Sequence, residues 1–166
     1  TIHSDKYIID LRYNGGGDSS IIRPLIEFLK GKRVVALINE YVFSSGRMAL
    51  VELKKIGAYV IGTNISTSLN AFGNNPSEYK IEGTDLIVKR SSSYFLYDND
   101  YNCTSFSKDN FFEYFKDRKV LLEPVFISPD LEVKETVDDI VAGRDIQMKM
   151  AFQYLEEKFN GKSSVW

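Results

Sequence analysis

Tyr7-Ile8-Ile9-Asp10-Leu11, followed at once by Arg12-Tyr13-Asn14-Gly15-Gly16-Gly17, is the stretch that decides the fold. Its apolar first half, bounded by a glycine cluster, is typical of a strand that is buried on both faces of a sheet. The three glycines can expose backbone N–H groups to an anionic oxygen, because no side chain stands in the way. The stretch therefore predicts a buried strand that leads into an anion-binding loop.

Helices and strands alternate after this loop. We expect a helix at 21–29, capped by Asp18, Ser19 or Ser20, and a second helix at about 45–56 that ends before Gly57. Apolar runs at 33–39 and 58–61 predict two further strands. This alternation, with tight connections, predicts right-handed crossovers and a parallel sheet. The second helix is expected to turn four residues inward: Met48, Val51, Leu53 and Ile56.

The segment after Gly62 predicts a small antiparallel extension of this α/β fold. Residues 79–81 and 86–89 have the pattern of a hairpin around a turn at 82–85. Residues 91–118 are rich in Ser, Asp, Asn and aromatic residues without clean periodicity, so we expect an irregular insertion with a short helix near 109–116. We interpret it as a flap over core surface; a wall that contacts substrate is the alternative, because aromatic side chains offer a large contact area.

The C-terminal part predicts two helical segments. Thr136-Val137-Asp138-Asp139 begins a short helical turn that ends at Gly143, and Asp145 caps a helix that runs to Phe159. The side chains expected to pack into the core from this helix are Ile146, Met150, Phe152, Leu155 and Phe159.

Composition limits the chain to one globular domain over residues 1–166, because 166 residues with 43% apolar content suffice for one buried core. The net charge of -2 comes from 21 basic and 23 acidic residues mixed along the chain, which argues against a nucleic-acid partner. Cys103 is the only cysteine, which excludes an internal disulfide and the usual thiolate zinc sites. No apolar run approaches the roughly 20 residues of a membrane span. Because a strand begins within a few residues of the start, we expect a fragment that lacks upstream regions.

Phe43-Ser44-Ser45-Gly46 places a serine at the start of the second helix. Ligands of doubly wound sheets bind beyond the carboxyl ends of the strands, and both this motif and the glycine loop follow such ends. If the two strands are neighbours, the Ser44 hydroxyl faces a crevice in which Ser45 and either Gly16 or Gly17 supply N–H donors to an oxyanion. Each motif alone has an alternative: an N-cap for Ser44, and a phosphate-binding or plain tight turn for the glycines, although they lack the Lys-Ser/Thr of a phosphate loop.

Several segments carry a family resemblance. Residues 8–17 have the pattern apolar-Asp-Leu-Arg-x-Asn-x-Gly-Gly, residues 34–45 form a strand that leads to a serine, and residues 57–62 are followed by Asn70-Ala71-Phe72-Gly73. Glu123-Pro124, Thr136-Val137-Asp138-Asp139 and Gly143-Arg144-Asp145 complete the set. The chain thereby resembles the C-terminal processing, or tail-specific, serine peptidases, whose catalytic domain has a ClpP/crotonase-like fold. The resemblance implies that Ser44 is the nucleophile.

Two positions depart from the pattern that the resemblance implies. Many members carry a lysine general base where this chain has Ser68, and a glutamate three residues after the nucleophile where it has Arg47. Lys54 and Lys55 lie on the predicted helix roughly 15 Å from Ser44, which is too far. His3, the only histidine, is expected to be solvated near the terminus, and some relatives recruit a histidine and a glutamate from elsewhere.

Three functions follow as hypotheses. The first is a serine peptidase that cleaves extended peptides through a Ser44 acyl-enzyme, and the second is a pseudopeptidase that binds peptides without cutting them. The third is an acyl-CoA enzyme, because crotonase-like folds use a similar pair of N–H donors; CoA would then raise the melting temperature. We expect a peptide or protein substrate and no cofactor or metal. An upstream domain or a second copy is a further expected partner, and the resemblance implies a location outside the cytoplasm.

Overall fold

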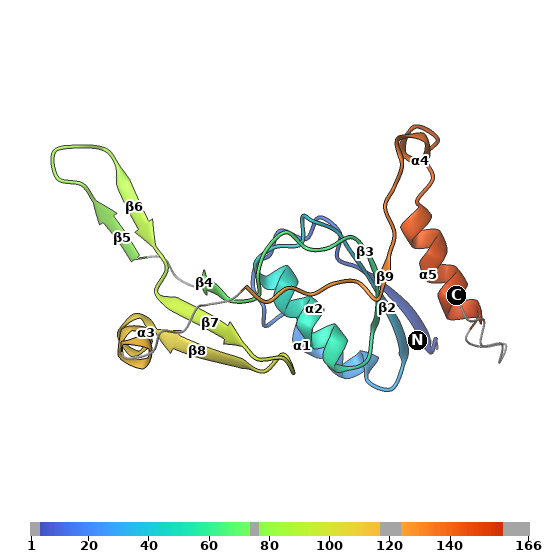
Figure 1. The fold of residues 1–166 in the computed structure, drawn as a ribbon, viewed down its shortest axis with the longest axis horizontal. Coiled ribbons are helices and arrows are strands. Elements are labelled where there is room, and N and C mark those ends of the chain that lie inside the picture. The colour runs from blue at the N-terminus through green and yellow to red at the C-terminus, as the bar shows by residue number, and fades with distance from the viewer. Residues whose placement is uncertain (1–3, 74–76, 117–123, 158–166) are drawn as a thin grey trace. The chain divides into compact units, whose positions relative to one another are not determined.

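In the computed structural model, a four-stranded parallel sheet forms the centre of the first unit of the chain. The structure describes residues 4–73, 77–116 and 124–157, and it divides the chain into two units, Thr1–Thr67 with Ile127–Trp166, and Ser68–Phe126 (Figure 1). We describe each unit by itself. The prediction of one catalytic domain over residues 1–166 stays a prediction.

The sheet of the first unit has the strand order β1-β2-β3-β9. Its strands are β1 (Lys6–Asp10), β2 (Arg33–Ile38), β3 (Tyr59–Gly62) and β9 (Leu131–Glu132). In the register, Ile8 lies beside Val35, Val35 beside Tyr59, and Ile61 beside Leu131. The predicted α/β class with a mainly parallel sheet is confirmed, and β1 and β2 are neighbours as the site hypothesis requires.

The prediction that β1 is buried on both faces is wrong. Its residues are half-buried or exposed, because β1 lies at the edge of the sheet and pairs only with β2. The central strand β2 has the predicted character instead, and its residues from Val35 to Ile38 are fully buried. The short strand β9 was not predicted from the sequence, because two paired residues leave no readable pattern.

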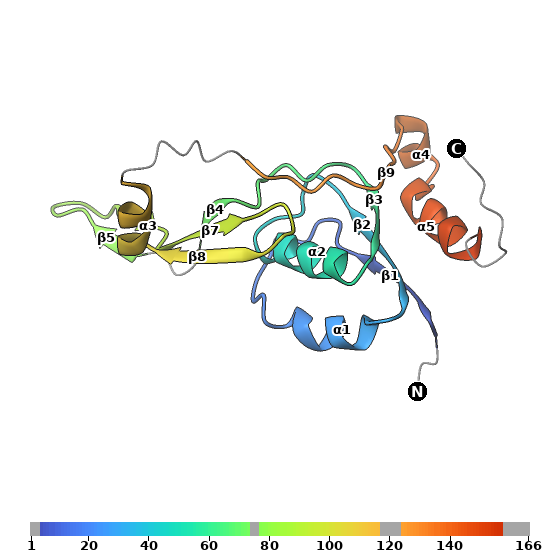
Figure 2. The same ribbon diagram turned by 60° about the horizontal axis from the view of Figure 1, so that its bottom comes forward.

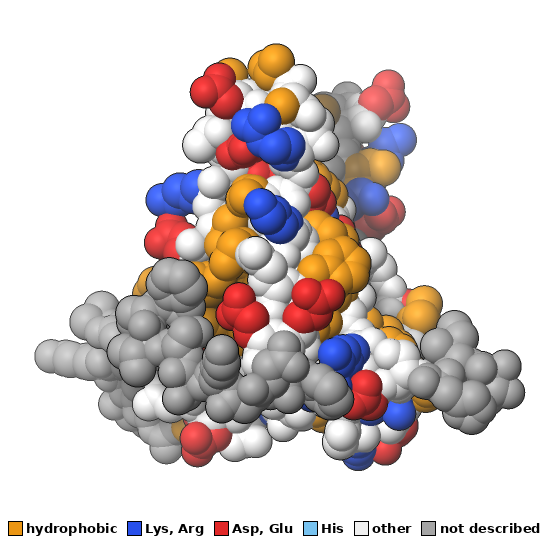
Figure 3. All heavy atoms as spheres, turned by 90° about the vertical axis from the view of Figure 1, so that its right-hand side faces the viewer, with side chains coloured by type: hydrophobic (Ala, Val, Ile, Leu, Met, Phe, Trp, Pro, Cys, Tyr) orange, Lys and Arg blue, Asp and Glu red, His pale blue; other side chains and the backbone are white. Residues whose placement is uncertain are grey.

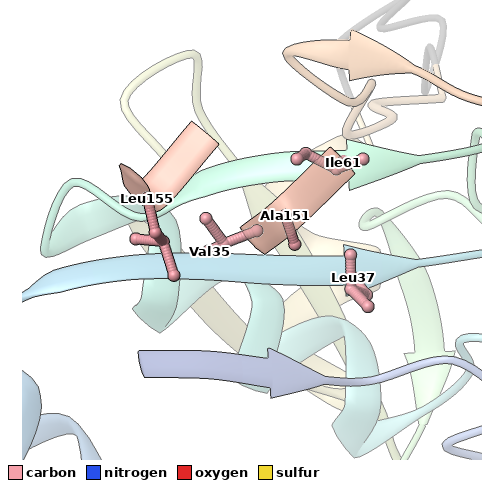
Figure 4. Close-up of a cluster of buried hydrophobic side chains, with 5 residues drawn as sticks. All are labelled: Val35, Leu37, Ile61, Ala151 and Leu155. Atoms are coloured by element: carbon pink, nitrogen blue, oxygen red, sulfur yellow. The ribbon is translucent and has the colours of Figure 1, made fainter. Parts of the chain in front are cut away.

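Helices cover both faces of the sheet. The helices α1 (Ile22–Leu29) and α2 (Ser45–Lys55) lie on the side opposite to α5 (Ile146–Glu157) (Figures 1 and 2). On the α5 side, Ala151 and Leu155 pack onto three strand residues (Figure 4): Val35, Leu37 and Ile61. The short helix α4 (Val137–Val141) precedes α5 and begins with a capping box between Thr136 and Asp139.

Three helix details differ from the sequence predictions. The N-cap position of α1 is Ile21, without a side-chain hydrogen bond, because Asp18 instead accepts from the Ser20 N–H. In α2 the fully buried side chains include Leu50 and Leu53, whereas Met48 and Ile56 are only half-buried. On α5, Phe152 is 55% exposed and does not belong to the core. Asp145 caps α5 as predicted, by accepting from the Met148 N–H.

The outer face of α4 and α5 is mixed in character. Figure 3 looks onto this face and shows basic, acidic and apolar side chains side by side. Three apolar residues of α4 are more than half exposed, with Val137 at 75%, Ile140 at 66% and Val141 at 81%.

Within the described ranges, no helix is both long and apolar enough to cross a membrane.

The second unit is built from antiparallel strands and one helix. The predicted hairpin is confirmed as β5 (Ser77–Lys80) paired with β6 (Ile87–Arg90). A three-stranded sheet has the order β4-β7-β8, formed by β4 (Ala71–Gly73), β7 (Ser93–Tyr97) and β8 (Cys103–Ser107). The helix α3 (Lys108–Phe115) follows β8 and matches the short helix predicted near 109–116.

The prediction of an irregular insertion at 91–118 is therefore wrong for its first part. The Ser93–Tyr97 strand is apolar on both sides of the chain, so it lacks the alternation by which strands are recognised. Predictions that fall on His3, Glu123 and Phe159 lie outside the described residues.

Gly62, at the end of β3, is predicted not to tolerate a side chain. A Cβ atom added there would lie 1.9 Å from the Ile38 carbonyl oxygen, and the residue has a φ of +140°. We expect Gly62→Ala to lower the free energy of unfolding by more than about 4 kcal/mol, because neither backbone can move without breaking the strand pairing. Urea denaturation followed by circular dichroism measures the loss.

The matched control is Gly57→Ala, where an added Cβ meets nothing within 4 Å although φ is +84°. This change should cost about 1 kcal/mol for the conformation alone. Equal losses in the two variants would contradict the close approach of Gly62 to Ile38.

Candidate active site

The glycine loop after β1 lies directly against the start of α2. A Cβ atom added to Gly16 would lie 2.5 Å from Ser44 Cβ, 3.0 Å from Ser44 Oγ and 3.1 Å from the Ser45 nitrogen. Two residues after Ser44, an added Cβ on Gly46 would lie 2.7 Å from the Asn14 carbonyl oxygen, which accepts a hydrogen bond from the Phe43 N–H at 2.9 Å. The structure therefore brings Gly16, Ser44 and Ser45 together, at the carboxyl ends of two neighbouring parallel strands.

Ser44 has a backbone conformation that residues other than glycine rarely adopt. Its φ is 52° and its ψ is -122°. Although it occupies the N-cap position of α2, its side chain makes no capping hydrogen bond. The capping alternative considered from the sequence is thus not what the structure shows. Backbone strain of this kind costs about 1–3 kcal/mol and is concentrated at functional sites, and here it occurs at a half-buried serine.

Two backbone N–H groups beside Ser44 are available to a ligand. The Gly16 N–H is engaged, because it donates to Asn14 Oδ1 at 3.0 Å. Among the residues that the structure describes, no acceptor is bonded to the N–H of Gly17 or of Ser45. The Ser45 N–H also lies at the first residue of α2, where the helix dipole favours negative charge. Of the two glycine N–H groups left open by the sequence, the one of Gly17 is therefore the one without an acceptor among the described residues.

The other candidates for the proton acceptor are engaged elsewhere. In the second unit, the Ser68 hydroxyl donates to the Val125 carbonyl and accepts from the N–H groups of Asn70 and Val125. Lys54 forms an ion pair with Asp130, and Lys55 with Glu52. The described part of the chain places no hydrogen-bond partner at Ser44 Oγ, and it brings no three His, Cys, Asp or Glu side chains together as a metal site would need.

Arg47, one turn into α2, lies over the ring of Phe43, with its Cζ atom 5.9 Å from the ring centroid. Its N–H donates to the Ser44 carbonyl oxygen at 3.1 Å. The side chain that replaces the family's glutamate therefore packs on the residue before the proposed nucleophile.

Asn39 joins the two loops of the site, a role that was not predicted from the sequence. Its side chain is 6% exposed, and its Oδ1 accepts from the N–H of Tyr13 at 3.2 Å and of Tyr41 at 3.1 Å. One buried amide therefore fixes the backbone after β1 relative to the backbone after β2. The available signal was a polar residue placed directly after a wholly apolar strand.

Arg12 ties the glycine loop to α5. Its guanidinium makes two hydrogen bonds to Asp10 and two to Asp145, the shortest at 2.7 Å in each pair, and a fifth to Gln147 at 3.3 Å. The bonds to Asp10 make the largest contribution and those to Asp145 the next, and together they raise the pKa of Arg12 above its ordinary value. In turn, the hydrogen bonds from Arg12 lower the pKa of Asp145. The Asp-Leu-Arg motif thus has a structural function beside the site.

The Arg12–Asp145 pair predicts a specific pH dependence of stability. Because the folded-state pKa of Asp145 lies below its ordinary value of about 3.9, its stabilisation is complete above about pH 5 and disappears as the pH falls through the lowered pKa. We expect Asp145→Asn to lower the free energy of unfolding by about 1 kcal/mol at pH 7, a modest value since Asp145 is 42% exposed. Urea titrations between pH 7 and pH 3 measure the difference.

The control is Glu156→Gln on the same helix, an exposed position that should show no such trend. A penalty for Asp145→Asn that stays constant down to pH 3 would contradict the ion pair.

An open pocket of about 450 Å³ lies beside the site. Gly16, Gly17 and Ser45 contribute to its wall, and most of the lining is apolar side chain from the β1 end, α1 and α2, including Leu11, Ile22, Leu25 and Ala49. The donors available to an oxyanion therefore border a hollow that accepts an apolar group.

Comparison with known proteins finds similarity to peptidases. The chain is 26% identical over 174 residues to tricorn protease of Thermoplasma acidophilum, a match that covers 91% of this chain and 14% of that protein. A search of protein-family models finds no match. The crystal structure of tricorn protease superposes with a TM-score of 0.61 at 24% identity, covering 96% of this chain and 16% of that chain.

A putative peptidase from Parabacteroides merdae superposes with a TM-score of 0.62 at 17% identity, covering 98% of this chain and 55% of that chain. The chain therefore spans only part of the proteins that it matches. It has a peptidase-like fold related to that of tricorn protease, which agrees with the resemblance to peptidases predicted from the sequence.

Proposed function

We propose that this chain is the catalytic part of a serine-type endopeptidase that cleaves extended peptides through an acyl-enzyme on Ser44. The observation that carries the proposal is the contact between Gly16 and Ser44, which sets a strained, uncapped serine beside the bare N–H groups of a glycine loop. The relationship to tricorn protease supports the same reaction class.

In this proposal, three residues take part in the reaction. Ser44 Oγ attacks the peptide carbonyl, and the carbonyl oxygen becomes an oxyanion in the tetrahedral intermediate. The N–H groups of Gly17 and Ser45 then donate to that oxyanion, an interaction that strengthens as charge develops. Collapse of the intermediate releases the amine and leaves the acyl group on Ser44, which water hydrolyses. The reaction also requires a base for the Ser44 proton, and the described residues place none at Oγ.

The apolar pocket supports a substrate preference. It shares Gly17 and Ser45 with the proposed oxyanion site, so a side chain next to the scissile bond would enter it. Its lining by Leu11, Ile22 and Leu25 fits an aliphatic or aromatic side chain, whose burial is favourable.

The alternative is a pseudopeptidase that binds peptides in the same crevice. It is favoured by Ser68, which stands where the resemblance expects a lysine and whose hydroxyl is held by Val125 and Asn70. If another group supplies the base, the chain can still be a peptidase. Measured hydrolysis of peptides therefore distinguishes the peptidase from the pseudopeptidase.

A fluorophosphonate probe combined with a peptide library tests both proposals. A peptidase should be labelled on Ser44 and should hydrolyse library members with an apolar residue before the cut. Labelling that persists in Ser44→Ala would remove Ser44 as the nucleophile. Peptide binding without hydrolysis by the pure wild-type protein would establish the pseudopeptidase instead.

A further inference from the structure

A second groove, of about 610 Å³, lies where the strands of the parallel sheet end. Its wall is formed by residues that follow β1, β2 and β3 and by residues on and after β9. We call it the tyrosine groove after Tyr13 and Tyr41, which belong to its lining. The tyrosine groove and the apolar pocket have no lining residue in common, and the catalytic proposal does not use the groove.

Two stacked aromatic rings form part of this groove. The ring centroids of Tyr13 and Tyr41 are 5.3 Å apart with an angle of 20° between the planes, yet the residues are 70% and 57% exposed. The two rings come from the loops after two different strands, and Asn39 holds the backbone N–H of both residues. Such a fixed, exposed aromatic surface binds planar or cationic groups through its faces.

Asn39 offers one donor to the groove. Its Oδ1 accepts two backbone N–H bonds, which fixes the orientation of the amide, and its Nδ2 has no hydrogen-bond partner among the described residues. Asn39 is only 6% exposed, and it belongs to the groove lining. An incoming carbonyl oxygen is the kind of group that accepts from such an amide N–H donor.

The charge of the groove favours a cation. Lys134 is paired with Glu132 at 2.9 Å, and Arg12 is neutralised by Asp10 and Asp145. Glu40 accepts one bond from Thr63, and Glu135 forms no ion pair with a described residue. Two carboxylates therefore remain without a cationic partner in the lining.

We propose that the tyrosine groove binds an arginine or lysine side chain of an extended peptide. The cation stacks on Tyr13 and Tyr41 and pairs with Glu40 or Glu135, while a carbonyl of the same peptide accepts from Asn39 Nδ2. This inference rests on the proposed function in taking a peptide as the ligand. It adds a basic residue, bound apart from the apolar pocket, to the substrate.

The test measures peptide binding to Ser44→Ala by fluorescence anisotropy, so that cleavage does not intervene. The probes are labelled decapeptides of alanine and glycine in which a single arginine is moved along the chain, each paired with a citrulline peptide of the same shape without charge. At one position we expect the arginine peptide to bind roughly tenfold more tightly than its citrulline partner.

Variants locate the site. Glu40→Gln combined with Glu135→Gln should reduce the arginine advantage to less than about twofold, and Tyr41→Ala should reduce it severalfold. The charge-matched control is Glu27→Gln on α1, where the side chain is exposed and pairs only with Lys30 among described residues. It should keep the full advantage.

Three results would overturn the inference. These are equal binding of arginine and citrulline peptides at every position, an arginine advantage that survives the double variant, and competition by free agmatine as strong as that of the peptide. The last result would identify a small-molecule cation as the ligand. Fluorophosphonate labelling of Ser44 in the wild-type chain reports on the proposed function separately, because it does not depend on the groove.

Discussion

Replacing Ser44 with alanine is expected to lower kcat/KM for peptide hydrolysis by at least about 10³-fold, since removal of a nucleophile leaves only the rate that oxyanion donors and binding provide. KM should change little, because the hydroxyl contributes to the transition state more than to substrate binding. Steady-state hydrolysis of the best library peptide by wild type and Ser44→Ala measures the effect. Circular dichroism should show the same fold for both.

Ser45→Ala is the matched control, because it removes a neighbouring half-buried hydroxyl and keeps the backbone N–H that we propose as a donor to the oxyanion. We expect its kcat/KM to remain within about threefold of wild type. If Ser45→Ala lost activity while Ser44→Ala kept it, Ser45 would be the nucleophile and the proposed mechanism would be contradicted.

Gly16→Ala should remove most of the activity while leaving both reactive groups in the chain. The new Cβ would lie 2.5 Å from Ser44 Cβ, and the residue has a φ of +108° that alanine avoids. The glycine loop and the start of α2 must therefore separate by about 1 Å, and a displacement of that size costs on the order of 10²-fold in rate. We expect kcat/KM to fall by about that factor or more, mainly through kcat.

Gly15→Ala, one residue away, is the control for this prediction. An added Cβ there meets nothing within 4 Å, and its φ lies outside the positive range. Activity should remain near that of wild type. Equal kinetics for the two glycine variants would show that Gly16 and Ser44 are not in the contact described above.

The sequence predicts the core of the first unit because local signals and tertiary structure agree there. The fully buried strand β2 is a continuous apolar run, and Gly57 ends the helical segment before β3. The edge position of β1 could not be predicted, because an apolar strand at an edge and one at the centre have the same residue pattern. Strand β7 was missed for the related reason that Tyr94, Phe95, Leu96 and Tyr97 do not alternate with polar residues.

The candidate site was predictable where it depends on short motifs and not where it depends on distant side chains. Gly16, Gly17, Ser44 and Ser45 follow two strand ends that the βαβ pattern makes neighbours. The bond that occupies the Gly16 N–H, the two bonds accepted by Asn39 and the contact of Arg12 with Asp145 depend on side-chain geometry that spacing does not encode. These three interactions fix the glycine loop, on which one of the proposed oxyanion donors, Gly17, lies.

A crystal structure of the wild-type protein with a peptide boronate or aldehyde is the decisive test of Ser44 as the nucleophile. We expect a covalent bond to Ser44 Oγ and an adduct oxygen within about 2.7–3.1 Å of the backbone nitrogens of Gly17 and Ser45, with the adjacent apolar side chain in the pocket beside Leu11. An adduct on another residue, or an adduct on Ser44 whose oxygen points away from the glycine loop, would contradict it.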